Sequence, residues 1–148
     1  MGLRCTCGVF TTPDTVGNNV FFFFGSPSVL GIGTATYTAD ACSETVPDGS
    51  VTLDFVDMLN MDGINRSFSF SSTVINEVIC EDQGLGECRI TVNGVGVVEG
   101  DPTPRNFSVA FRDRPEIDDL VEFFEISGFA TQAGFTPVSP EFTGFGCM

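Results

Sequence analysis

Short stretches in which apolar and polar residues alternate recur along the chain, and this period of two limits what it can fold into. The clearest examples are VTLDF at 51–55, SFSFS at 67–71 and NFSVAF at 106–111. Successive side chains of a strand point to opposite faces, so such alternation predicts strands with one buried face. No window of a dozen residues keeps an apolar stripe at helical spacing, and the sequence therefore predicts an all-β protein.

Polar segments rich in Gly, Pro and Asp separate these stretches and are typical of exposed turns; they are SETVPDGS, EDQGLGE, EGDPTPR and RDRPEIDD. Within ITVNGVGVV, residues 90–98, the pair Asn93-Gly94 predicts a two-residue hairpin, because both residues tolerate positive φ. Further strands are expected over 19–24, 29–38, 50–58, 66–79, 105–112 and 120–129. About eight short strands with such turns predict a two-sheet β-sandwich or jelly roll.

The 148 residues suit a single domain with extended ends. We expect residues 1–18 to form an N-terminal connector arm, 19–130 the β-sandwich domain and 131–148 a C-terminal extended tail. Both ends carry little alternation, and the arm contains Cys5 and Cys7. Terminal segments are usually poorly ordered unless they are tied down, so cysteines in the arm indicate that it is tied to something.

The net charge is −14, with six Arg, no Lys and no His. A chain without a basic surface cannot neutralise phosphates, which disfavours nucleic acids and anionic membranes as partners. No apolar run is long enough to cross a bilayer as a helix. Six cysteines without histidine are typical of a disulfide set, so we expect an extracellular, spore-surface or cell-surface location, without an evident signal peptide after Met1.

Catalysis has little support in this composition. Without His there is no Ser-His or Cys-His pair, and without Lys there is no Schiff-base chemistry. Two acid pairs, Glu122 with Glu125 and Asp118 with Asp119, have the residue types of a glycosidase site. They lie beside turns or on the polar side of a strand, where acids usually face solvent. We predict no enzyme and no catalytic residue.

Calcium is the metal that the acidic loops would suit best, because carboxylates and loop carbonyls are its ligands. The candidates are Asp54, Asp57 and Asp62 in LDFVDMLNMDG and Asp118 and Asp119 in RDRPEIDD. Neither segment has the spacing of an EF-hand loop, and acids that keep a surface hydrated are the simpler interpretation. The sequence predicts no other cofactor.

The cysteines carry most of the remaining information. Cys80 and Cys88 bracket the loop EDQGLGE, and we predict an intrachain disulfide between them. Cys5 and Cys7 would close a strained ring if they paired together, so each should seek a distant partner. The other two cysteines are Cys42 and Cys147. Bonds within one subunit, bonds between subunits and free thiols all stay open.

The run Phe21–Phe24 in NVFFFFG places aromatic residues on both faces of one strand. Such a strand is buried on both faces, either in the core of one domain or by contact with another subunit. A central core strand is the simpler interpretation. The run is also the best candidate in the sequence for a subunit interface, because an exposed aromatic run is an aggregation hazard unless assembly covers it.

The layout of the cysteines resembles that of the bacterial endospore appendage fibres called Ena. That resemblance implies a jelly-roll subunit whose N-terminal connector is disulfide-bonded to earlier subunits of a stack. Cys5 and Cys7 would match the connector cysteines, Cys42 the cysteine on an early strand and Cys147 the late cysteine. This sequence departs from that plan because its pair is C-x-C, Cys147 lies beyond the last expected strand, and Cys80 and Cys88 are additional.

We therefore expect a structural subunit that self-assembles through its N-terminal arm and intersubunit disulfides into an extracellular fibre or coat, with copies of itself as partners. Edge strands of an open sheet could add to such contacts. The alternative is a monomeric extracellular binding or adhesion module with internal disulfides and calcium. The sequons at Asn65 and Asn106 are of a kind expected by chance and do not establish glycosylation.

Overall fold

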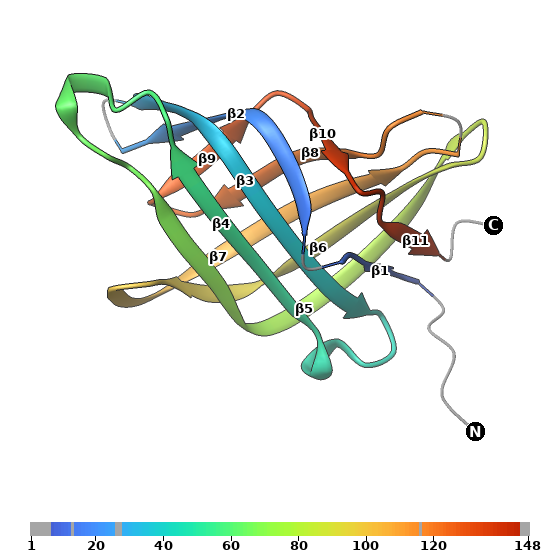
Figure 1. The fold of residues 1–148 in the computed structure, drawn as a ribbon. Coiled ribbons are helices and arrows are strands. Elements are labelled where there is room, and N and C mark those ends of the chain that lie inside the picture. The colour runs from blue at the N-terminus through green and yellow to red at the C-terminus, as the bar shows by residue number, and fades with distance from the viewer. Residues whose placement is uncertain (1–6, 13, 26–27, 116, 146–148) are drawn as a thin grey trace.

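The structure is a computed structural model that describes residues 7–12, 14–25, 28–115 and 117–145. Strands dominate the described residues, so the predicted all-β class is confirmed (Figure 1). Two short 3₁₀ turns, η1 (Val46–Asp48) and η2 (Met61–Gly63), interrupt the strands. The strands are β1 (Gly8–Phe10), β2 (Thr15–Phe24), β3 (Val29–Cys42), β4 (Ser50–Asp57), β5 (Phe68–Gly84), β6 (Glu87–Val98), β7 (Asp101–Asp113), β8 (Leu120–Ile126), β9 (Ala130–Ala133), β10 (Thr136–Ser139) and β11 (Thr143–Phe145).

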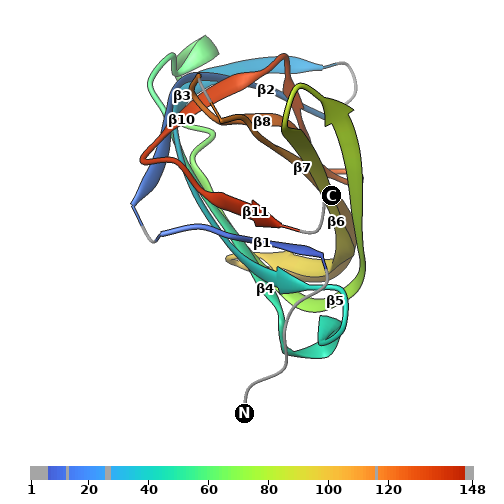
Figure 2. The same ribbon diagram turned by 90° about the vertical axis from the view of Figure 1, so that its right-hand side faces the viewer.

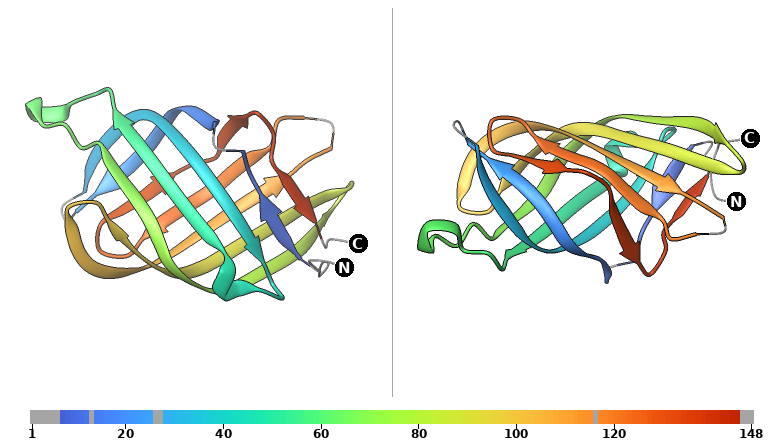
Figure 3. Two further views of the ribbon diagram at one scale, coloured as in Figure 1. Left: turned by 60° about the horizontal axis from the view of Figure 1, so that its bottom comes forward. Right: turned by 90° about the horizontal axis from the view of Figure 1, so that it is seen from above.

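The sheet closes into an eight-stranded barrel, and the predicted two-sheet sandwich or jelly roll is not confirmed (Figure 3). Strands β2 to β8 pair antiparallel in chain order, and β9 pairs with both β8 and β2. Strand β10 continues β9 between the same two neighbours. Alternating sequences suit barrels and sandwiches equally, so the pattern could not reveal closure. Closure also removes the edge strands that a neighbour might have completed.

Phenylalanine side chains fill the interior of the barrel. The rings of Phe22 and Phe55 lie 4.9 Å apart, and those of Phe70 and Phe107 lie 5.1 Å apart, both edge to face. An eight-stranded barrel is about wide enough for side chains to fill it, and here aromatic residues do so. Tyr37 is fully buried among them and donates a hydrogen bond to Gln132 (2.7 Å).

The predicted hairpin at Asn93-Gly94 is wrong, because both residues lie inside β6, which continues to Val98. Gly94 faces the core, where a β-carbon would lie 2.9 Å from the ring of Phe107 and would collide with the backbone oxygen of Val74. This glycine makes room for close packing and not for a turn. The turns before and after β6 instead contain three glycines with positive φ, which are Gly84, Gly86 and Gly100.

The structure also moves the expected domain boundaries. The barrel begins at Thr15, within the segment expected to be a connector arm, and β1 in that segment pairs with β3. Residues 131–139, expected in the tail, form the rest of β9 and β10 and complete the barrel. The polar residues of this stretch, with Gly134 and Pro137 among them, hid a strand that is interrupted at 134–135.

Candidate functional site

Strands β1 and β11 form a short ribbon across one mouth of the barrel, as Figure 2 shows. On its other side β1 continues the sheet along the end of β3, where Gly8 pairs with Cys42. Val9 of β1 is fully buried, and the ring of Phe142, just before β11, lies 5.3 Å from that of Phe111. The ribbon therefore belongs to the hydrophobic core at this mouth.

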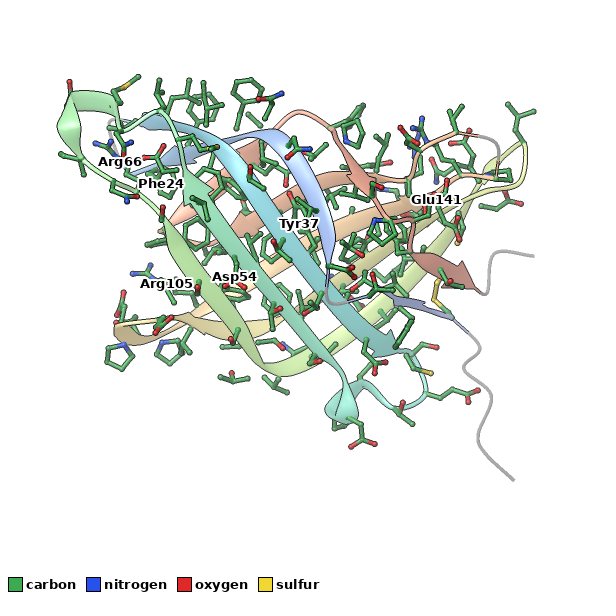
Figure 4. The ribbon with its side chains drawn as sticks, viewed as in Figure 1. Phe24, Tyr37, Asp54, Arg66, Arg105 and Glu141 are labelled. Carbon is green, nitrogen blue, oxygen red and sulfur yellow. A yellow bond between two sulfur atoms is a disulfide. The ribbon has the colours of Figure 1, made fainter. Side chains whose placement is uncertain are left out.

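Two carboxylates fasten the C-terminal side of the ribbon. Asp119 accepts hydrogen bonds from the backbone N–H groups of Arg114 (2.8 Å) and Phe142 (3.0 Å), and Asp113 accepts one from Gly144 (2.7 Å). Burial raises the pKa of Asp119 to about 6, and the nearby negative charges of Asp113 and Glu141 act in the same direction. Figure 4 shows Glu141 on this side of the barrel.

A disulfide fastens the N-terminal side of the ribbon. Cys7, next to β1, is bonded to Cys80 on β5, with their Cα atoms 6.0 Å apart and a sequence separation of 73. Cys42 and Cys88 each take part in a disulfide as well. The other two cysteines of the sequence prediction, Cys5 and Cys147, lie outside the described residues.

The predicted disulfide between Cys80 and Cys88 is wrong, because Cys80 is bonded to Cys7. The role of Cys7 in bonds between subunits stays a prediction. In the β5–β6 hairpin Cys80 lies opposite Ile90, and Cys88 lies opposite Asp82. The two cysteines are therefore diagonal neighbours, with side chains about 7–8 Å apart, whereas a disulfide needs β-carbons about 4 Å apart.

The run Phe21–Phe24 divides between the two faces of β2. Phe22 is fully buried and Phe24 is half-buried inside the barrel, whereas Phe21 and Phe23 on the outside are 41% and 43% exposed. The interpretation as a core strand is confirmed for the inner face, and contact of the outer face with another subunit stays a prediction. Exposed apolar side chains continue from here over the outside of the barrel, and we call this set the apolar face; its members are Phe21, Phe23, Phe135, Val56, Met58, Leu59, Met61 and Ile64.

The β4–β5 loop, which carries part of the apolar face, is organised by Asp57. Its carboxylate accepts hydrogen bonds from the backbone N–H groups of Leu59 (3.0 Å), Asn60 (3.3 Å) and Arg66 (2.9 Å). Burial of Asp57 opposes its ionisation, but these hydrogen bonds and the charge of Arg66 outweigh that effect and lower its pKa. Arg66 also donates to the carbonyls of Met61 and Ile64 (2.8 and 3.3 Å). The loop is therefore ordered although its apolar side chains face outward.

The calcium candidates do not come together. Asp54 points outward from the middle of β4, Asp57 is engaged by the loop backbone, and Asp62 is exposed on η2. Asp118 is exposed, whereas Asp119 is buried under the ribbon. Among the residues that the structure describes, no group of three or more acidic or cysteine side chains could hold a metal ion.

The acid pair Glu122 and Glu125 is also separated. Glu122 is buried on the outside of β8, where its carboxylate lies 3.0 Å from Nε of Arg89 and 2.5 Å from Nε of Arg112. Glu125 instead lines an open pocket of about 460 Å³ at the end of the barrel opposite the β1–β11 ribbon, between the β2–β3 and β8–β9 turns. The Arg–Glu–Arg cluster joins β6, β7 and β8 and was not predicted, because only the strand register brings Arg89 and Arg112 together.

The two sequon asparagines, Asn65 and Asn106, are exposed. In the described part of the chain, no helix has the length and apolar character needed to span a bilayer. Comparisons with protein-family models, curated proteins and solved structures find no match. The mouth ribbon and the apolar face are therefore interpreted from their own geometry.

Proposed function

We propose that this chain is a structural subunit that assembles with copies of itself outside the reducing cytosol, by placing its N-terminal arm on the barrel of a neighbour. The described part of that arm is residues 7–12. The observation that carries the proposal is that eight strands close the barrel without β1. The arm therefore binds at the mouth without contributing to barrel closure.

Apart from the turn that leads into β2, residues 7–12 make their main contacts with the mouth of the barrel. These contacts are the Cys7–Cys80 disulfide, the pairing of β1 with β3 and β11, burial of Val9, and two hydrogen bonds between Thr11 and Ala39. An arm from a second copy could make every one of them. Exchange of identical elements between protomers needs little new free energy because no contact is lost.

The connection between the arm and β2 supplies a place for the exchange. It is a short turn in which the N–H of Thr15 donates to the carbonyl of Thr12 (3.2 Å), with the two hydroxyls 3.2 Å apart. Straightening this turn would direct β1 away from its own barrel. In the exchanged arrangement the Cys7–Cys80 bond would join two subunits and make the polymer resistant to denaturants.

A second candidate is a monomeric extracellular binding module, since Cys7 and Cys80 are bonded within one chain. Electrophoresis in sodium dodecyl sulfate separates the two functions. Arm exchange predicts covalent oligomers that collapse to the 15.8 kDa monomer on reduction. A single monomer band in both lanes, from material assembled at high concentration, would refute the exchange.

The variant Cys7→Ser with Cys80→Ser should remove the covalent oligomers that depend on this bond. The matched control is Leu85→Asn, because Leu85 is exposed at the tip of the β5–β6 turn. This control should leave the oligomers unchanged.

A further inference from the structure

The apolar face suggests a second contact, which does not depend on the arm. On the outside of β2, Phe21 pairs with Ile32 of β3 and with Ala133 of β9. Phe135 follows two residues after Ala133, between β9 and β10. Phe23 lies between Leu30 and Thr131. The positions that pair directly with Phe21 and Phe23 on the neighbouring strands carry no ionisable side chain. Glu125 lies one strand further, opposite Thr131, and lines the same pocket as Phe23.

The β4–β5 loop extends the same surface. The backbone N–H of Met58 donates to the carbonyl of Ile32 (2.8 Å), and the hydroxyl of Thr34 lies 3.7 Å from the sulfur of Met58. The loop and the outside of β2 lie along the same side of the barrel, which Figure 3 (right) shows from above. Asp57 and Arg66 hold the loop in place, so these apolar side chains are presented in a fixed arrangement.

The combined exposed area of these side chains is large for a monomer. Eight side chains that are 36% to 70% exposed present on the order of 500 Å² of apolar surface, if a large apolar side chain has roughly 150 Å² to bury. That area is near the upper end for the largest patch of a monomer, about 300–600 Å². It is also more than half of the roughly 800 Å² that each partner of a standard interface buries.

The charge of the chain indicates which partner binds the apolar face. The chain carries a net charge of −14, so two copies repel each other wherever their acidic surfaces meet. The direct strand partners of Phe21 and Phe23 are uncharged, so this repulsion is reduced there. The border of the apolar face carries both signs, with Glu125 near Phe23 and with Asp62 and Arg66 in the β4–β5 loop, whereas a basic partner would be drawn to the acidic surfaces elsewhere.

We infer that the apolar face binds the same face of a second copy, in a two-fold and non-covalent contact. A self-complementary patch is the arrangement that a two-fold axis requires. The inference rests on the proposed function only in that both partners are copies of this chain. In an assembly, the mouth would link subunits covalently and this face would join them laterally.

The test is sedimentation velocity of the oxidised full-length chain over a range of concentrations, at 50 mM and 500 mM NaCl. We expect a dimer whose fraction increases at high salt, because salt screens the acidic repulsion and leaves apolar contact intact. The variant Phe21→Ser with Phe23→Ser should weaken dimerisation by about tenfold or more. An unchanged melting temperature would confirm that this variant is folded.

The matched control is Val74→Ser with Ile79→Ser, which removes two apolar side chains that are each 40% exposed on β5. It should leave the dimer unchanged. A monomer at every concentration and both salts would overturn the inference, as would equal weakening by both variants. Binding of the monomer to phosphatidylcholine vesicles, lost in the Phe21→Ser, Phe23→Ser variant, would instead identify a lipid contact and also overturn it. A dimer through this face dissociates in sodium dodecyl sulfate, whereas an arm-linked dimer does not, so the two proposals fail separately.

Discussion

The two ends of the barrel are held in different ways. At the mouth, the β1–β11 ribbon is fixed by a disulfide, by buried Val9 and Phe142, and by the carboxylate of Asp119. At the opposite end, where β4 finishes, Asp57 fixes the backbone of a loop whose apolar side chains remain exposed. The contacts at the mouth would be the same whichever copy supplied the arm. At the far end, the apolar side chains of the loop remain exposed. We therefore expect the mouth to contribute most to stability, and we propose that it links copies covalently while the apolar face joins them non-covalently.

The largest expected difference between the ends comes from the disulfide. For a bond that spans 73 residues, the chain-entropy model gives a loss of about 4 kcal/mol in the free energy of unfolding for Cys7→Ser with Cys80→Ser. Urea unfolding of dilute monomer measures it. The Phe21→Ser, Phe23→Ser variant should differ from the unmodified chain by only about 0.5 kcal/mol. Equal losses of unfolding free energy in the two variants would show that the disulfide does not make the mouth the more stabilised end.

Two phenylalanines test the same difference between the ends without changing the disulfide. Phe142 is buried against Phe111, and Phe135 is 67% exposed between β9 and β10. Phe142→Ala should lower the free energy of unfolding by about 3 kcal/mol, because it leaves a cavity under the ribbon. Phe135→Ala should change it by no more than about 0.5 kcal/mol. Denaturant titration of both variants gives the answer, and the reverse ranking would mean that the ribbon is not part of the core.

The two buried aspartates should respond to pH in opposite directions. The pKa of Asp119 is about 6 in the fold against 3.8 for an ordinary Asp side chain, so the fold binds this proton more tightly than the unfolded chain does. Its contribution is present below about pH 4 and is lost as pH rises through 6, by about 2–3 kcal/mol. Asp119→Asn should remove this dependence. The check is the melting temperature measured from pH 4 to 7. If it changes with pH as steeply in the variant as in the unmodified chain, a group other than Asp119 causes the dependence.

Asp57 should give the smaller effect, with the opposite sign. Its pKa is lowered in the fold, so its contribution is present above the ordinary Asp pKa and is lost as pH falls through the lowered pKa. Asp57→Asn should cost about 1–2 kcal/mol at pH 7, through loss of a charged hydrogen bond to the loop backbone. Its effect should shrink on acidification. An effect of the variant that grows at low pH would show that another group controls the loop.

The strands were predictable from local patterns, and their closure was not. Alternation identified the middle of β4, the start of β5 and the second half of β7, because one side of each faces the core. It could not show that β9 pairs with β2, since that pairing joins residues more than a hundred positions apart. The turn signal at Asn93-Gly94 was misleading because the need for space beside Phe107 selects the same glycine.

The candidate site was predictable in its residue types and not in its pairings. The cysteines and the run Phe21–Phe24 both mark it in the sequence, but Cys80 finds Cys7 only because the ribbon crosses the mouth. Asp119 was singled out as a calcium ligand, whereas its carboxylate holds the backbone of Phe142. Burial, which the sequence does not record, decides between these roles.

The most direct test of the central claim asks whose Cys80 each Cys7 is bonded to. Equal amounts of ¹⁴N-labelled and ¹⁵N-labelled chains are reduced, mixed, reoxidised at high concentration and separated into assembled and monomeric fractions. Each fraction is digested with pepsin, at a pH that prevents disulfide exchange, and the Cys7–Cys80 peptides are weighed by mass spectrometry. We predict peptides of mixed label in the assembled fraction and peptides of a single label in the monomer. Single-label peptides alone in the assembled fraction would contradict the exchange of the arm between copies.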